Sequence, residues 1–244
     1  MKAPRFPAVA FDLDGTLYPN SSFYARLIPF LLKESGYLRA FGKARDRLRM
    51  EYAALEINEA KTGEKLSPAG NNDSFYKIQA RYMSVILKTG ADSLEKKTEE
   101  IIYRGWEPLF KKVRLYSHVI DTLKTLRENG VKLALMSDFP PDKKIEYLGL
   151  SGLWDAVMCS ETIGRLKPDP LPFIELQKTL NLPADEILYV GNSFSYDVLG
   201  ARKIGMKTAW IRQKSMYFFP DKKRERQADF VFFDYRQLRN FVLI

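Results

Sequence analysis

Six short apolar runs recur along the chain, and each has the length of a buried β-strand. They are Phe6–Asp12, Val131–Ser137, Ala156–Cys159, Ile187–Val190, Thr208–Ile211 and Phe230–Phe233. Between these runs, apolar residues return at helical spacing, as at Val119, Leu123 and Leu126 before the second run. A nearly continuous apolar run is typical of a strand covered on both faces, and strands that alternate with helices predict an α/β fold on a parallel sheet.

Residues 13–130 separate the first two runs, which is too long for a single crossover helix and predicts an inserted domain. Apolar spacing predicts four helices in this stretch, with Pro29 either kinking the first or confining it to a late start. The helices are expected around Leu27–Leu32, Phe41–Leu55, Phe75–Val85 and Leu94–Ile102, with Asp73 and Asp92-Ser93 as candidate caps and Lys61–Asn72 as a loop. The prediction is an all-helical cap over 18–112, inserted into an α/β core formed by 1–17 and 113–244.

The charge balance favours anionic partners, because 39 Lys and Arg face 30 Asp and Glu, a formal net charge of +9. Nucleic acid is not expected, since the basic run Lys222–Arg226 is interrupted by Glu225 and lacks interleaved aromatic residues. No apolar run approaches the roughly 18 residues of a membrane span, and the N-terminus lacks a signal-peptide pattern. A cytoplasmic protein without a membrane partner is therefore expected. The pattern says nothing about oligomeric state.

The chemistry must depend on carboxylates, amines and hydroxyls, because the chain has one cysteine and one histidine. Asp12 and Asp14 follow the first strand, at the edge where open parallel sheets bind ligands. One carboxylate can attack an electrophile while the other handles protons, and a hard cation bound to oxygen relieves their repulsion of an anionic substrate. Gly15 can take a positive φ and let backbone N–H groups approach a phosphate.

Three further polar groups stand at the ends of later strands. Ser137 can hydrogen-bond a phosphoryl oxygen, and the Lys167 ammonium can neutralise charge. Asn192 and Asp197 offer oxygen atoms to a metal. A Cys-x5-Arg spacing from Cys159 to Arg165 is also present, but Glu161 would put negative charge in a phosphate cradle, so Cys159 is interpreted as core packing.

Together these segments resemble the haloacid dehalogenase superfamily over nearly the whole chain. The resemblance rests on FDLDGTL at 11–17, Ser137, Lys167 and GNSFSYD at 191–197. It implies a Rossmann-like parallel sheet of order 5-4-1-2-3 with the helical cap inserted between the first and second motifs. It further implies that Asp12 is the nucleophile of an aspartyl-phosphate, and that Asp14 is the general acid and base.

The same resemblance implies the remaining roles. Ser137 and Lys167 would hold and neutralise the phosphoryl group, with Gly15, Thr16 and Asp138 beside it. The Asp138 carboxylate would repel phosphate if it faced it, so it is expected to point away or to bind the rest of the substrate. The implied cofactor is Mg²⁺, and its ligands are Asp12, the Asp14 carbonyl, Asn192 and Asp197. Position 192 usually holds Asp in the family, so weaker metal binding, or a larger share for Asp197, is expected.

The resulting hypothesis is a Mg²⁺-dependent phosphomonoesterase that acts on a small phosphorylated metabolite, such as a nucleotide or a sugar phosphate. Asp14 argues against a dehalogenase, because the family's dehalogenases generally lack an acid there. Gly191-Asn192 does not match the phosphomutase pattern. These two classes remain alternatives, together with a non-catalytic binding protein of the same fold, which Asn192 alone supports.

Overall fold

A computed structural model describes residues 3–62, 73–213 and 220–244. All six predicted apolar runs form strands, and every neighbouring pair is parallel. The strands are β1 (Ala8–Phe11), β2 (Lys132–Ser137), β3 (Ala156–Cys159), β4 (Ile187–Gly191), β5 (Lys207–Ile211) and β6 (Phe230–Phe232). Their order in the sheet is β3-β2-β1-β4-β5-β6. The predicted order 5-4-1-2-3 is therefore confirmed, with β6 added beyond β5.

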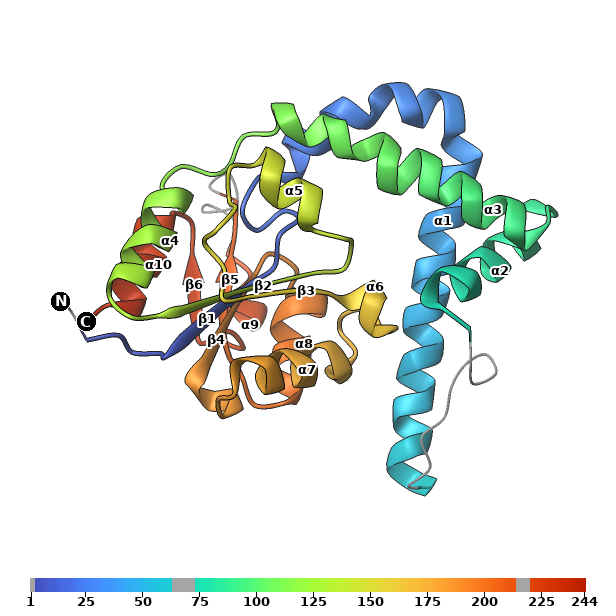
Figure 1. Ribbon diagram of the computed structural model, residues 1–244. Helices are drawn as coiled ribbons and strands as arrows, with labels where there is room; N and C mark the ends of the chain where they lie inside the picture. The colour runs from blue at the N-terminus through green and yellow to red at the C-terminus, as the bar shows by residue number, and fades with distance from the viewer. Residues whose placement is uncertain (1–2, 63–72, 214–219) are drawn as a thin grey trace.

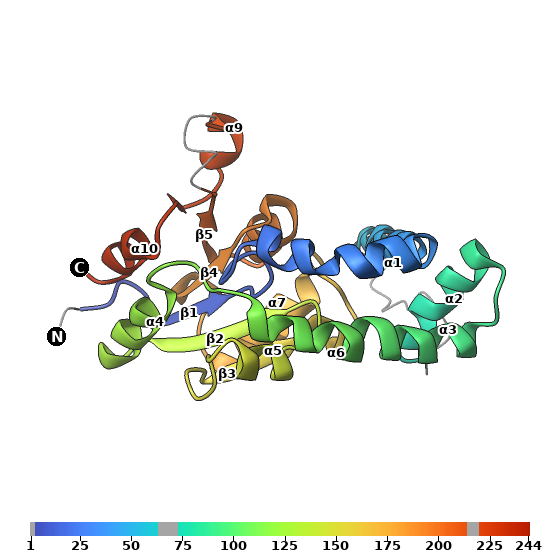
Figure 2. The same ribbon diagram turned by 90° about the horizontal axis from the view of Figure 1, so that it is seen from above.

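Helices cover both faces of the sheet (Figures 1 and 2). Val9 and Phe11 of β1 belong to the core under α4 (Val119–Glu128) and α10 (Tyr235–Val242). Ala8 and Ala10 face the opposite core, under α7 (Pro170–Leu180) and alongside α8 (Leu199–Lys203). Because successive strand residues point to opposite faces, a strand buried on both sides must be apolar throughout. This packing explains the continuous apolar runs.

Short helical segments complete the core. They are α5 (Asp142–Tyr147), α6 (Ser160–Ile163), α9 (Lys222–Glu225), the 3₁₀ turn η3 (Ala184–Glu186) and the π-helical turn η4 (Phe194–Val198). The first four residues of the basic run 222–226 thus form a one-turn helix capped by Asp221. Within the described residues, no helix is both long enough and apolar enough to cross a membrane.

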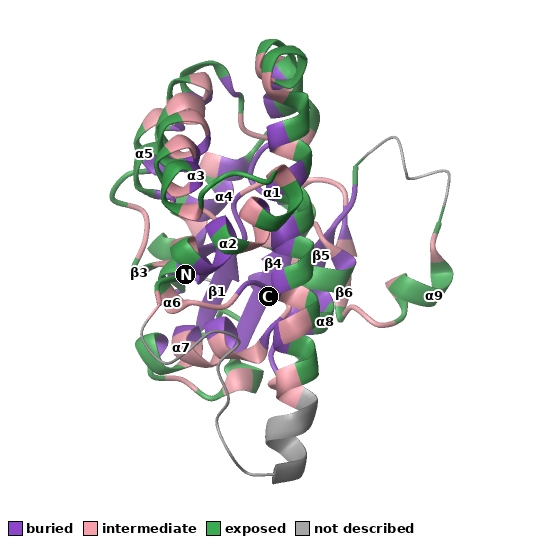
Figure 3. Cartoon of the chain, turned by 90° about the vertical axis from the view of Figure 1, so that its right-hand side faces the viewer, coloured by how far each residue is buried: buried purple, intermediate pink, exposed green. Residues whose placement is uncertain are grey.

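The chain between β1 and β2 forms the helical cap (Figure 1). It comprises α1 (Asn20–Thr62), α2 (Phe75–Leu87), α3 (Ala91–Thr98), the π-helical turn η1 (Glu99–Arg104) and the 3₁₀ turn η2 (Glu107–Lys112). Figure 3 shows the buried residues on the inner sides of these helices and exposed residues outside. An insertion of helices after the first strand was the prediction. The exact division of the chain into domains stays a prediction.

Helix α1 differs from its prediction in two ways. It joins the first two predicted helices and passes through Pro29, and its break lies at Glu34, which has non-helical φ and ψ. Leu27 is buried, but Leu31 and Leu32 are exposed, so the apolar spacing there does not mark one buried face. A proline removes one backbone hydrogen bond, and a helix can continue past it when other contacts hold the chain.

The cap's other details are close to the predicted ones. The N-cap of α2 is Ser74, whose side chain accepts from the Lys77 N–H, and not the neighbouring Asp73. Asp92 lies in the first turn of α3. Of the predicted loop 61–72, the first two residues belong to α1 and the rest lie outside the described residues.

Candidate active site

The loop after β1 brings the first motif to the carboxyl edge of the sheet. Phe11 lies opposite Leu135 of β2 and Val190 of β4, so the ends of all three strands open at one level. Gly15 has φ +90°, and a Cβ at this position would collide with Asn192. The loop therefore needs glycine for its conformation and for its close approach to the fourth motif.

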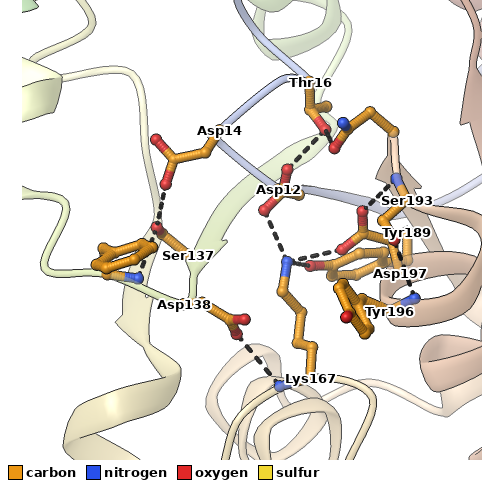
Figure 4. A network of polar contacts seen from close by, with 12 residues as sticks. Asp12, Asp14, Thr16, Ser137, Asp138, Lys167, Tyr189, Ser193, Tyr196 and Asp197 are labelled. Atoms are coloured by element: carbon orange, nitrogen blue, oxygen red, sulfur yellow. Dashed lines mark hydrogen bonds and ion pairs between the residues drawn. The ribbon is translucent and has the colours of Figure 1, made fainter. Parts of the chain in front are cut away.

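The Asp12 carboxylate is held on both oxygens (Figure 4). The Thr16 hydroxyl donates to Oδ2 at 2.7 Å, and the Lys167 ammonium donates to Oδ1 at 2.7 Å. The residue is 5% exposed. Two charge-assisted hydrogen bonds on a buried group fix its orientation, which is what a nucleophile needs.

Lys167 lies between two carboxylates. Its ammonium is 2.7 Å from Asp12 Oδ1 and 2.7 Å from Asp197 Oδ1, and it donates to the Tyr189 hydroxyl at 3.2 Å. Burial would lower the pKa of Lys167, but Asp12 and Asp197 outweigh it and raise the pKa well above its ordinary value. Lys167 is therefore a permanent cation at the centre of the site.

The same arrangement governs the charge of Asp12 in the protein without metal. Burial raises the pKa of Asp12 to about 7, since it outweighs the lowering by Lys167, and the carboxylates of Asp197 and Asp14 add to the rise. A cation bound near this carboxylate would favour its ionised form.

Asp14 points away from Lys167 toward the end of β2 (Figure 4). Its Oδ2 accepts from the Ser137 hydroxyl at 3.2 Å, and the Tyr18 hydroxyl donates to Oδ1. The ammonium of Lys144, on α5, contacts both oxygens at 2.8 and 2.7 Å. The predicted acid and base thus stands beside the predicted phosphate-binding serine, in a position separate from that of Asp12.

The fourth motif supplies oxygen atoms around Asp12. Asn192 Oδ1 lies 3.2 Å from the Thr16 hydroxyl, which itself donates to Asp12. Asp197 directs Oδ1 to Lys167, and its Oδ2 accepts from the Ser193 N–H at 2.9 Å. Asn192 therefore lies on the side of Asp12 Oδ2, the oxygen that Thr16 contacts. Asp197 already binds Lys167.

The Asp138 side chain joins the core to the cap. Its Oδ2 is 2.9 Å from Nη2 of Arg49 on α1, and its Oδ1 accepts from the Lys167 N–H at 3.2 Å. Burial would raise the pKa of Asp138, but Lys167, Arg49 and Arg45 together lower it. The carboxylate is thus ionised and held by the cap, and its predicted place beside the phosphate stays a prediction.

Cys159 has the environment of a packing residue. Burial and the charge of Glu161 raise the pKa of the Cys159 thiol. A nucleophilic cysteine needs a lowered pKa and an electropositive setting. The Cys-x5-Arg spacing therefore has no chemical role that this environment favours.

The predicted residues Asp12, Asp14, Asp138, Lys167, Asn192 and Asp197 line one cavity of about 410 Å³. Ser137 and Thr16 lie behind this wall, where their hydroxyls hydrogen-bond Asp14 and Asp12, respectively. The sequence analysis missed Lys144 and Arg49. Lys144 belongs to the lysine pair Lys143-Lys144 in the helix that follows the second motif, but only the direction of α5 decides which lysine points inward.

Comparisons with known proteins agree with this geometry. The model of the haloacid dehalogenase-like hydrolases matches residues 6–205. The chain is 31% identical over 212 residues to a glyceraldehyde 3-phosphate phosphatase of Methanopyrus kandleri, with 84% of each protein covered. It is 27% identical over 243 residues to a phosphoglycolate phosphatase of Haemophilus influenzae, covering 96% of this chain and 97% of that one.

A solved structure has the same fold. It is a hydrolase of this type from Bacillus subtilis with magnesium bound, which superposes with a TM-score of 0.61 at 17% identity and covers 98% of this chain and 99% of that one. The chain belongs to the haloacid dehalogenase-like hydrolase family. The predicted family, the hydrolase class and the helical cap after the first strand are confirmed.

Proposed function

We propose that the protein is a Mg²⁺-dependent phosphomonoesterase that hydrolyses a small phosphorylated metabolite through a phosphoryl group carried on Asp12. One observation carries the proposal: a buried carboxylate fixed between Thr16 and Lys167, with a second carboxylate beside Ser137 in the same cavity. Relatives with 27–31% identity that act on phosphoglycolate and glyceraldehyde 3-phosphate support a small phosphorylated substrate.

The two carboxylates divide the reaction between them. In the first step an Asp12 oxygen bonds to phosphorus, the ester P–O bond breaks, and Asp14 gives its proton to the departing alcohol oxygen. In the second step Asp14 takes a proton from water, whose oxygen bonds to phosphorus as the Asp12–phosphorus bond breaks. Lys167 and Ser137 contact the phosphoryl oxygens, where charge develops.

The oxygen donors fit Mg²⁺. Mg²⁺ is usually held by one or two carboxylates together with waters and substrate phosphate. The site offers Asp12, the Asp14 carbonyl, Asn192 and Asp197. Among the described residues no three acidic, histidine or cysteine side chains gather as a metal site, so the set depends on amide and carbonyl oxygens as well. When bound, the ion offsets the repulsion between phosphate and carboxylates.

Removing the metal tests the cofactor. Phosphate release from a panel of phosphorylated metabolites is expected to fall at least about 100-fold in EDTA and to return with excess Mg²⁺. Released phosphate is measured directly, with Asp12→Asn as the blank. Undiminished hydrolysis in EDTA would contradict the metal requirement, and no Asp12-dependent release from any ester would contradict the proposed function.

Asn192 sets the strength of metal binding. We expect Asn192→Asp to tighten Mg²⁺ binding about tenfold, because it adds a negative charge to the donor set near Asp12. The Mg²⁺ concentration for half-maximal activity and calorimetric titration measure the change. Asp197→Asn is the comparison: its carboxylate already binds Lys167, so a smaller effect on affinity is expected. A larger loss in Asp197→Asn than the gain in Asn192→Asp would make Asp197 the main ligand.

A further inference from the structure

A second cavity opens from the catalytic one. It has a volume of about 240 Å³ and lies between the core and the cap. The two cavities share Asp14, Asn20, Tyr24 and Phe139 in their walls. Asp14, the group that gives its proton to the departing alcohol, thus stands at the boundary between them. The alcohol part of a bound ester must leave phosphorus on the Asp14 side, toward this second cavity.

Aromatic rings make up most of the wall. They include Tyr18, Phe23, Tyr24, Trp106, Phe110 and Phe139. Phe23 stacks on Phe110 with centroids 4.7 Å apart, and Trp106 meets Phe23 edge-on at 5.8 Å. Rings that hold one another in this way form a preorganised, water-poor surface. The wall is therefore ready for an apolar group before any ligand enters.

The polar groups nearest Asp14 in this cavity are already engaged, and the Tyr18 hydroxyl donates to Asp14. Lys144 is bound to Asp14, and its ammonium lies 5.0 Å from the ring centres of both Phe110 and Phe139. The indole nitrogen of Trp106 is buried and has no hydrogen-bond partner within the described part of the chain. Asp14, Tyr18 and Lys144 therefore offer little to a small alcohol rich in hydroxyls, whereas the Trp106 N–H can donate to one polar atom of a ligand.

We propose that the substrate is a phosphate monoester whose alcohol carries an aromatic ring, and that this ring occupies the cavity between the core and the cap. The inference rests on the proposed function and names its substrate class. An apolar protein cavity of roughly 150 Å³ is enough to bind benzene. The volume here is larger, so it accepts a single ring with a short linker to the phosphate.

A matched pair of esters tests the proposal. 2-Phenylethyl phosphate and ethyl phosphate differ in the ring but leave as similar alkoxides. We expect kcat/KM to be about 10- to 100-fold higher for the phenylethyl ester, because burying a ring is favourable and ethyl fills little of the cavity. Calorimetric binding of 3-phenylpropylphosphonate against propylphosphonate, in Mg²⁺, reports the same preference without turnover.

Tyr24→Ala tests whether the preference for the phenylethyl ester arises in this cavity. Tyr24 is 57% exposed, so Tyr24→Ala spares the core, and it is expected to lower the phenylethyl-to-ethyl ratio at least about threefold. Leu32→Ala is the matched control, since Leu32 lies on the same helix, is 81% exposed and is outside the cavity wall. The control is expected to keep the wild-type ratio.

The outcomes separate this inference from the proposed function. If ethyl phosphate is turned over as well as or better than phenylethyl phosphate, and the two phosphonates bind equally, the aromatic preference is overturned. The proposed phosphatase function would still hold. Preferential binding of the phenyl phosphonate without turnover of either ester supports the ring site and overturns the phosphatase. Absence of both turnover and binding overturns both. If the phenylethyl-to-ethyl ratio of kcat/KM falls equally in Leu32→Ala and Tyr24→Ala, the ring does not bind in this cavity.

Discussion

Asp12→Asn is expected to lower phosphate release at least about 10⁴-fold while the protein keeps its fold. The amide has nearly the same shape as the carboxylate, and its oxygen can still accept a hydrogen bond from Thr16. It has no negative charge to attack phosphorus, so the covalent intermediate cannot form. A carboxylate that only oriented water would tolerate the change far better.

Rapid-quench mass spectrometry measures the intermediate directly. Wild-type protein mixed with substrate is expected to carry a phosphoryl group on the peptide containing Asp12, and the variant none. Asp121→Asn, the same chemical change at an exposed position on α4, is the matched control and is expected to retain turnover. Turnover by Asp12→Asn comparable to that of the control, with no adduct in the wild type, would mean that Asp12 is not the nucleophile.

The central strands of the sheet could be predicted because they are buried on both faces, whereas the edge strands β3 and β6 are only partly buried. A strand buried on both faces must be apolar throughout, and the apolar runs show this requirement without any knowledge of partners. The order of the strands came from the family resemblance. The position of Asp12, Ser137 and Asn192 at one edge follows from parallel strands that end at a common level.

The side-chain contacts between distant parts of the chain could not be predicted. Lys144 reaches Asp14 across 130 positions, and Arg49 reaches Asp138 across 89. Such pairs depend on how α1 and α5 are placed, which local spacing does not encode. Helix α1 shows the same limit: Pro29 suggests a break by its chemistry, but the helix continues past it and its break lies at Glu34.

Lys167→Met is expected to lower hydrolysis at least about 10³-fold, because the ammonium that faces developing phosphoryl charge is lost. The same change is expected to reduce the free energy of unfolding by about 3–5 kcal/mol near neutral pH, since Asp12 and Asp197 are left buried without their common cation. Chemical denaturation measures the second effect and phosphate release the first.

The stability loss should depend on pH with a defined sign. The folded-state pKa of Asp12 is raised from 3.8 to about 7, so the folded protein binds more protons than the unfolded chain in this range. The contribution of Asp12 to stability is therefore fully present below about pH 4 and is lost as the pH rises toward 7. Removing Lys167 removes an interaction that lowers this pKa, so the variant's deficit is expected to grow as the pH rises.

A double variant separates the catalytic role of Lys167 from its structural one. Lys167→Met with Asp197→Asn leaves a single buried carboxylate, so part of the lost stability is expected to return. Hydrolysis is not expected to return, because no cation replaces the ammonium 2.7 Å from Asp12. Recovery of turnover together with stability would make Lys167 a purely structural residue, since restoring the fold would then suffice for phosphoryl transfer.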